Sequence, residues 1–391
     1  MTVTRTSQTF APPVMEARRW LDGVDFSQDR PLINVSQAAP VELPPLAMRE
    51  ALADAVLTTA QAHLYGPVLG SAELRAEVAA RTARLYGGAV SAAQVAITSG
   101  CNQAFNAAIV TLSTEGDEVI LPTPWYFNHK MWLDMVGVRA VPLPTGPDML
   151  PDPDQAAALI TPRTRAITLV SPNNPAGVEY PAPLIRAFAD LARRHGLALI
   201  VDETYRDFHS RSGPAHDLFT DPDWDDTLIQ LYSFSKAYRL TGHRVGAMLA
   251  SPARLAEVEK FLDTVTICPN QLGQIAALWG MQHLDQWLAA ERDEILSRRA
   301  AIEAGFPRLA NQGWALRGVG AYFAYVTHPF DMPSDQLAQK MVSAAAVLAL
   351  PGTMFVPPDD PTGARHLRIA FANVDSAGIT ELFDRMAELT L

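Results

Sequence analysis

Short apolar segments alternate with amphipathic helical patterns through the first two thirds of the chain. Helical patterns at residues 46–59 and 71–85, the second with Ser71 as its N-cap, precede an apolar segment at 95–98. Further apolar segments of strand length follow at residues 118–121, 166–170, 198–202, 228–232 and 245–250, several of them separated by helical patterns. Because parallel strands need long crossover connections, which are usually helices, this alternation predicts an α/β fold with a mostly parallel sheet flanked by helices.

The pattern changes near residue 270. Residues 270–304 read as helical for longer than any other segment, and the elements after them read as strand, helix, strand, strand and helix. A chain of 391 residues also exceeds what one hydrophobic core usually organises. We therefore predict a large cofactor-binding domain at residues 46–285. A small α+β domain is expected to combine the proline-rich residues 1–45 with residues 286–391.

Composition argues against several classes of partner. The formal net charge is −11, and no cluster of basic residues is present, so neither nucleic acid nor an anionic membrane is an expected partner. The two cysteines, Cys101 and Cys268, do not form a disulfide or zinc pattern, and we expect no bound metal. No apolar segment approaches the length of a membrane span or forms a signal core. The expected location is the cytoplasm.

The segment 233–246 contains a lysine with partners suited to a phosphate-bearing aldehyde. Lys236 follows the predicted buried strand 228–232, where partial withdrawal from water would lower the pKa of its amine. Such an amine can form a Schiff base with an aldehyde, while Ser233 hydrogen-bonds a phosphate and Arg244 neutralises it. The predicted cofactor is pyridoxal 5'-phosphate. The alternative for Lys236 is an ordinary surface lysine in a polar loop.

Other predicted strand ends have residues that complement the same cofactor. Gly100 and Cys101 lie where a strand turns into a helix, so free backbone amides and the helix dipole favour an anion there. Asp202 can keep a pyridine nitrogen protonated, and Asn174 and Tyr205 can hydrogen-bond a ring oxygen. Ordinary turn, capping and salt-bridge roles are the alternatives for these positions.

Two further residues are candidates for contacts with the cofactor ring and the substrate. Tyr126 offers an aromatic face for stacking on a planar heterocycle, with core packing as the alternative. Arg368 lies inside an alternating apolar strand, where an arginine is costly unless it is paired. A substrate carboxylate is a suitable bidentate partner, and a structural salt bridge is the competing explanation.

Together these motifs resemble the class I/II aminotransferases of pyridoxal-phosphate fold type I, which are similar to aspartate aminotransferase. The family pattern Ser-x-Ser-Lys followed by Gly-x-Arg-x-Gly occurs at residues 233–246, and Asn-Pro-x-Gly occurs at 174–177. The resemblance runs from about residue 34 to the C-terminus. It implies that Lys236 carries the cofactor as the internal aldimine and then acts as the general base. The remaining implied contacts are Asp202 with the ring nitrogen, Asn174 and Tyr205 with the ring oxygen, Tyr126 with the ring face, Gly100, Cys101, Ser233 and Arg244 with the phosphate, and Arg368 with the substrate α-carboxylate.

The resemblance also implies a homodimer with shared active sites, because Tyr65 matches the family tyrosine that reaches the phosphate in the partner subunit. Two positions depart from the family pattern. Ala38 replaces a usual glycine, and its methyl group is expected to narrow the substrate pocket. Arg239 replaces a small residue, and either places a cation near the cofactor or points to solvent.

The substrate preference is predicted from the absence of the basic residues that bind an acidic substrate side chain in some relatives. Aspartate-type relatives bring an arginine from the segment after the phosphate-binding arginine, but none occurs between Arg254 and Arg292. Asn102 stands where other relatives use a lysine. We therefore expect amino transfer from a neutral or aromatic L-amino acid to a 2-oxo acid by a ping-pong mechanism. The alternatives are a lyase, synthase or cyclase on the same scaffold and, in another class, a non-catalytic ligand-binding homologue.

Overall fold

The computed structural model describes residues 3–390 and contains a seven-stranded sheet in the order β2-β8-β7-β6-β5-β3-β4. Its strands are β2 (Val95–Thr98), β3 (Glu118–Thr123), β4 (Arg139–Pro144), β5 (Thr164–Val170), β6 (Ala198–Asp202), β7 (Leu228–Ser233) and β8 (Gly246–Leu249). Strands β4, β3, β5, β6 and β7 pair in parallel, and β8 is antiparallel to both of its neighbours. The predicted mostly parallel sheet is confirmed.

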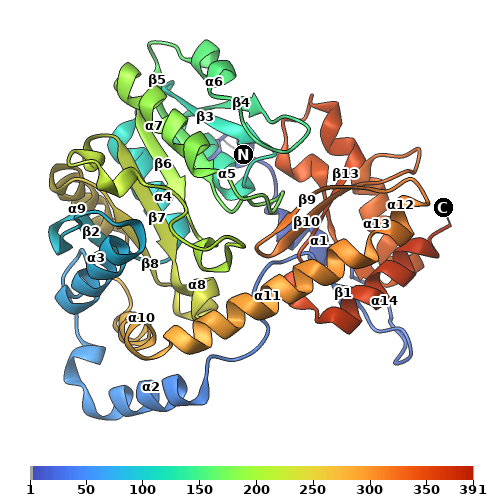
Figure 1. Ribbon diagram of the computed structural model, residues 1–391, viewed down its shortest axis with the longest axis horizontal. Coiled ribbons are helices and arrows are strands. Elements are labelled where there is room, and N and C mark those ends of the chain that lie inside the picture. The colour runs from blue at the N-terminus through green and yellow to red at the C-terminus, as the bar shows by residue number, and fades with distance from the viewer. Residues whose placement is uncertain (1–2, 391) are drawn as a thin grey trace.

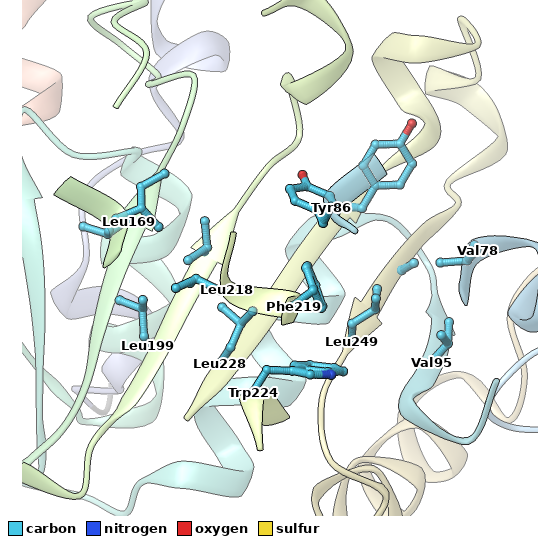
Figure 2. Packing of buried hydrophobic residues seen from close by; sticks show 14 of the residues in the cluster. Val78, Tyr86, Val95, Leu169, Leu199, Leu218, Phe219, Trp224, Leu228 and Leu249 are labelled. Atoms are coloured by element: carbon cyan, nitrogen blue, oxygen red, sulfur yellow. The ribbon is translucent and has the colours of Figure 1, made fainter. Parts of the chain in front are cut away.

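Helices cover both faces of this sheet (Figure 1). One face packs against α3 (Ala72–Tyr86), α7 (Ala182–His195) and α10 (Gln271–His283), and the other packs against α4 (Cys101–Leu112), α5 (Phe127–Val136) and α9 (Pro252–Thr266). Figure 2 shows the first face, where leucines of the adjacent strands β6, β7 and β8 lie in one layer with Phe219 and Trp224. Burial of these apolar side chains is the main favourable contribution to the stability of this layer.

A second, four-stranded antiparallel sheet has the order β12-β13-β10-β9. Its strands are β9 (Ala315–Gly320), β10 (Phe323–Thr327), β12 (Leu350–Pro351) and β13 (His366–Ile369). The N-terminal strand β1 (Ile33–Asn34) pairs in parallel with β11 (Val347–Leu348), so residues near the start of the chain lie beside its C-terminal part. The remaining helices are α1 (Pro13–Arg19), α2 (Leu46–Thr58), α6 (Pro153–Leu159), α8 (Phe234–Ala237), α11 (Asp285–Gly305), α12 (Pro307–Ala310), α13 (Ser334–Ala345) and α14 (Ser376–Ala387).

Helix α11 runs from the seven-stranded sheet to the four-stranded sheet (Figure 1). The single long helix predicted at residues 270–304 is two helices, α10 and α11, because the backbone at Leu284 leaves the helical conformation (φ −113°, ψ 23°). The break separates two apolar faces, since α10 packs in the core of the large sheet and Ile295 and Ile302 of α11 pack in the core of the small one. The domain boundaries at residues 45 and 285 remain a prediction.

Candidate active site

A cavity of about 190 Å³ lies at the carboxyl end of the parallel strands β5, β6 and β7. Open α/β sheets bind ligands at this edge. Most of the predicted site residues line it, together with neighbours that were not singled out; the lining residues are Val14, Gln37, Ala38, Cys101, Asn102, Tyr126, Phe127, Asn128, Val170, Asn174, Asp202, Thr204, Tyr205, Ser233, Ser235, Lys236, Arg244 and Arg368. Gly100 and Tyr65, of the predicted contact residues, are not among them, and neither is Arg239.

Lys236 lies in α8, a single helical turn that begins directly after β7. The Ser233 hydroxyl caps this turn by accepting a hydrogen bond from the Ser235 amide at 3.2 Å. The Lys236 side chain is half-buried, and its Nζ donates to the Ala38 carbonyl at 2.5 Å. Burial, reinforced by the positive charges of Arg244 and Arg368, lowers the pKa of this amine to about 7. The geometry therefore gives a lysine that is largely uncharged just above neutral pH.

Asp202 ends β6 and is almost fully buried. Its Oδ1 accepts the Thr204 amide at 3.0 Å, and His129 Nε2 lies 3.3 Å from its Oδ2. Burial alone would raise the pKa of this carboxyl, but the His129 imidazole and the Thr204 contacts lower it below its usual value. Asp202 is therefore an ionised carboxylate inside the protein, which suits a partner that carries a positive charge.

His129 is a site residue that the sequence did not single out. It lies in the first turn of α5, and its ring stacks on Phe105 at 3.9 Å and meets Tyr126 edge-on at 5.0 Å. The available signal was spacing, because residues three apart at the start of a helix lie on the same side. His129 thus follows from Tyr126 once the helix start at residue 127 is known.

The turn between β2 and α4 forms the part of the site predicted for the phosphate. Gly100 has a φ of 86°, and a Cβ there would collide with the Arg244 guanidinium. A Cβ at Gly246 would lie 2.7 Å from the Gly100 carbonyl carbon and 2.8 Å from the Cys101 nitrogen. The two glycines therefore allow Arg244 and strand β8 to lie close to the turn between β2 and α4. The first amides of α4 have no hydrogen-bond partner inside the helix. Arg244 Nη1 donates to the Ser235 hydroxyl at 3.3 Å.

Cys101 begins α4, as predicted for a small residue at a helix start. Burial, with a contribution from the Asp202 charge, raises the pKa of its thiol well above the usual value. The thiol therefore stays protonated, which excludes a thiolate nucleophile at neutral pH.

Arg368 lies in β13 with only 2% of its surface exposed. Its Nη1 donates to Asn174 Oδ1 at 3.0 Å, its Nη2 donates to the Ser36 carbonyl, and its Nε has no hydrogen-bond partner among residues 3–390. Burial lowers its pKa to about 10, so the guanidinium remains charged at neutral pH. No carboxylate of the described chain lies within ion-pair distance, and the structural salt bridge considered for this residue is therefore not formed.

Two tyrosines line the cavity beside these groups. The Tyr126 hydroxyl donates to Asn102 Oδ1 at 3.3 Å and accepts from Asn128 Nδ2 at 2.8 Å. Burial raises the pKa of Tyr126 to about 12 and that of Tyr205 well above its usual value, so both phenols are neutral hydrogen-bonding groups at physiological pH. Stacking of Tyr126 on a cofactor ring remains a prediction.

The remaining predicted residues lie in different surroundings. Ala38 lines the cavity, whereas Tyr65 is 81% exposed and outside it. Arg239 is also outside the cavity, and neither alternative for it is correct. Its guanidinium is mostly buried in an ion-pair cluster, with Nη2 2.5 Å from Glu42 and 2.7 Å from Glu291.

Residues 3–390 contain neither a candidate metal site nor a membrane-spanning helix. No group of three or more His, Cys, Asp or Glu side chains there is placed to hold a metal ion. None of the helices in that range is both long enough and apolar enough to cross a bilayer.

The mixed seven-stranded sheet, with a half-buried lysine at its carboxyl edge and a second sheet beside it, defines an α/β protein of the fold type I class. Residues 30–386 match the family of class I and II aminotransferases, and the chain belongs to that family. The family prediction is confirmed.

Named relatives agree with this assignment. The chain is 30% identical over 389 residues to the valine–pyruvate aminotransferase of Mycobacterium tuberculosis, covering 96% of this chain and 95% of the relative. It is 32% identical over 314 residues to the arginine–pyruvate transaminase of Pseudomonas aeruginosa, covering 78% and 77%. The solved structure of N-succinyldiaminopimelate aminotransferase from Mycobacterium tuberculosis superposes with a TM-score of 0.89 at 26% identity, covering 100% of both chains. The protein is an enzyme that transfers amino groups.

Proposed function

We propose that the enzyme uses pyridoxal 5'-phosphate to move an amino group from a neutral or aromatic L-amino acid to a 2-oxo acid in a ping-pong cycle. One observation supports this most strongly. The same cavity is lined by Lys236, whose amine has a pKa of about 7, and by Arg368, which is buried. No carboxylate among residues 3–390 forms an ion pair with Arg368. Lys236 suits proton transfer near neutral pH, and Arg368 suits a substrate carboxylate.

The chemistry of the lining groups fits this cofactor. Asp202 is an ionised carboxylate for a pyridinium nitrogen, and Asn174 and Tyr205 offer hydrogen bonds to a ring oxygen. The groups proposed to hold the phosphate are Gly100, Cys101, Ser233 and Arg244. When bound, pyridoxal phosphate supplies an aldehyde that condenses with amino groups and a ring that withdraws electrons from the substrate α-carbon.

Lys236 is proposed as the group that anchors the cofactor and then moves a proton at the substrate α-carbon. Its pKa of about 7 leaves a large fraction of the amine unprotonated at physiological pH, as a general base requires. The Ala38 carbonyl, 2.5 Å from Nζ, orients the amine inside the cavity. Burial also keeps bulk water away from the group, which strengthens its electrostatic interactions.

Arg368 is proposed to orient the substrate through its α-carboxylate. Its planar fork allows a bidentate contact, and a carboxylate would neutralise a buried charge that lacks a counterion. The other cations that line the cavity in the described chain are Lys236 and Arg244, which have the roles given above. Val14 and Phe127 add apolar surface to the cavity. This supports neutral or aromatic side chains over acidic ones.

A homodimer with Tyr65 contributed to the partner's site is part of the same proposal. Tyr65 is 81% exposed, and its neighbours Leu57 and Leu64 are 84% and 61% exposed. A second copy of the chain would cover these apolar side chains. The predicted cytoplasmic location likewise remains a proposal.

Substitution of Arg368 tests the substrate assignment. Arg368→Gln should lower kcat/KM for neutral and aromatic donors by about ten- to a hundredfold, because a charge-assisted carboxylate contact is lost. Arg365→Gln is the matched control, since Arg365 lies three residues earlier and outside the cavity, and within residues 3–390 it donates only to backbone carbonyls. Aspartate acting as a better donor than every neutral amino acid in the same panel would refute the proposed preference.

A further inference from the structure

A second cavity, of about 410 Å³, lies outside the active site and is larger than it. It is bounded by the end of α3, the start of α11 and the segment that follows β6. The lining residues are Arg81, Arg84, Leu85, Tyr86, Arg206, Asp207, His209, Arg211, Gly213, Pro214, Ala215, Asp285, Leu288, Ala289 and Arg292. Its volume is in the range of small-molecule sites.

This cavity and the active site lie behind opposite faces of the large sheet. Successive strand residues point to opposite faces, so Asp202 at the end of β6 faces the active site and Glu203 faces the other side. Glu203 accordingly accepts the Tyr86 hydroxyl of α3 at 2.8 Å. In β7, Ser233 faces the active site, whereas Tyr232 packs in the same core cluster as Tyr86. The second cavity is therefore a separate site and not an extension of the first.

The polar groups of the second cavity are mainly cationic. Five arginines and two aspartates line it. Arg206 is only 8% exposed, and its Nε and Nη1 have no hydrogen-bond partner in the part of the chain that the structure describes. Its guanidinium lies over the Tyr232 ring, 3.8 Å from the centroid, which holds the side chain in place. A buried guanidinium with free donors is costly unless an anion pairs with it.

Asp207 and Glu203 favour the charged form of Arg206, but neither carboxylate lies within ion-pair distance of it among residues 3–390. Asp285 lies 2.6 Å from Arg81, and Asp207 accepts the Tyr232 hydroxyl at 2.8 Å. Arg292 donates only to backbone carbonyls, including that of His209 at 2.7 Å. Among residues 3–390, no carboxylate lies within ion-pair distance of Arg206 or Arg292. Neither guanidinium is therefore held in a direct ion pair.

Apolar side chains form the other part of the wall, chiefly Leu85, Leu288 and Ala289 from the two helices. We propose that this cavity binds a small molecule that has an oxyanionic group, either a carboxylate or a phosphate, attached to an apolar body. Arg206 and Arg292 bind the oxyanion, because guanidinium groups match the geometry of both carboxylate and phosphate. The helix side chains cover the apolar body.

Calorimetric titration of the cofactor-loaded enzyme tests the site with two probes, phenyl phosphate and phenylacetate, which share an apolar ring and differ in the anion. We expect saturable binding of at least one probe, and the tighter one identifies the preferred anion. Arg206→Gln and Arg292→Gln should each weaken that binding about tenfold or more. Arg299→Gln is the matched control, because Arg299 lies two turns further along α11, outside the cavity, with Glu303 as its partner at 3.1 Å.

Arg368→Gln distinguishes binding in the second cavity from binding in the active site. A probe in the second cavity should bind this variant as tightly as it binds the wild type. Arg292 is only partly buried, so Arg292→Gln should fold and transfer amino groups normally, even if Arg206→Gln does not fold. The proposal is wrong if neither probe binds saturably at millimolar concentration. It is also wrong if Arg368→Gln abolishes binding while Arg292→Gln leaves it unchanged.

Discussion

At the scale of single residues, the surroundings of Lys236 set the pKa of its amine. Burial comes first, and the charges of Arg244 and Arg368 act in the same direction, so the pKa is about 7 against 10.5 for a free lysine. Because a lowered pKa favours the uncharged form, the reactive fraction of this amine rises with pH through about 7. For a free lysine amine, the uncharged fraction rises with pH through about 10.5.

Competitive acetylation of the protein without cofactor checks this difference. The chain has only four lysines, at positions 130, 236, 260 and 340, so mass spectrometry can follow each one. Lys236 should reach half of its maximal acetylation rate near pH 7. Lys260, whose side chain is 71% exposed, is the internal control for a lysine outside the cavity. Parallel profiles for the two lysines would contradict the proposed environment.

Several residues of the candidate site could be proposed from sequence because their neighbours along the chain form recognisable motifs. Lys236 and Arg244 belong to one short segment, and Asp202 ends a clear apolar strand. Arg239 and His129 differ, because their surroundings come from distant segments. The partner of Arg239 is Glu291 on α11, and that of His129 is Asp202 across the sheet edge. Local spacing can place His129 beside Tyr126, but it contains no information about the pairs with Asp202 and Glu291.

At the scale of elements, the turn from β2 into α4 depends on a residue without a side chain. An alanine at position 100 would have to adopt a φ of 86° and place its Cβ against the Arg244 guanidinium. With a ψ of 166°, this is a conformation that glycine alone adopts readily, so the backbone strain is on the order of 1–3 kcal/mol. Displacement of Arg244 adds to the effect on the proposed phosphate site.

Gly100→Ala should therefore weaken binding of pyridoxal phosphate by about tenfold or more, measured by equilibrium dialysis. Gly116→Ala is the matched control, because Gly116 has nearly the same φ, 84°, but a Cβ there meets nothing within 4 Å. Only the first variant should lose cofactor affinity. Equal affinities of the two variants for pyridoxal phosphate would show that the turn between β2 and α4 does not bind the cofactor.

Element boundaries were predictable where apolar periodicity and caps agree. The strands at 95–98 and 198–202 and the N-cap at Ser71 are as expected. Strand β4 was not predicted, because its sequence contains two prolines and alternates exposed with buried positions at the sheet edge. The break at Leu284 was missed because apolar periodicity continues on both sides of it.

At the scale of the whole molecule, Arg239 ties three distant segments together. It follows the lysine of the site, pairs with Glu42 of the N-terminal segment and forms a two-pronged contact with Glu291 of α11 at 2.8 and 2.9 Å. Its φ of 55° is unusual for a residue with a side chain. The cluster therefore links the region of the site to the helix that runs toward the second sheet.

Glu291→Gln should lower the free energy of unfolding by about 1–2 kcal/mol, because the half-buried arginine loses its main counterion. Glu42→Gln should cost less than about 1 kcal/mol, since the Glu42 side chain is 55% exposed. Chemical denaturation of both variants measures this. Glu257→Gln, which removes an exposed pair with Lys260, is the control. A loss no larger for Glu291→Gln than for this control would show that the cluster is not structural.

We expect the enzyme to transfer amino groups and not to release them as ammonia. Incubation of the cofactor-loaded enzyme with one neutral amino acid, in the absence of any 2-oxo acid acceptor, tests it most directly. We predict one equivalent of 2-oxo acid per bound cofactor, no ammonia, and no product from Lys236→Ala. Continued turnover with release of ammonia would contradict the account and favour a lyase on the same scaffold.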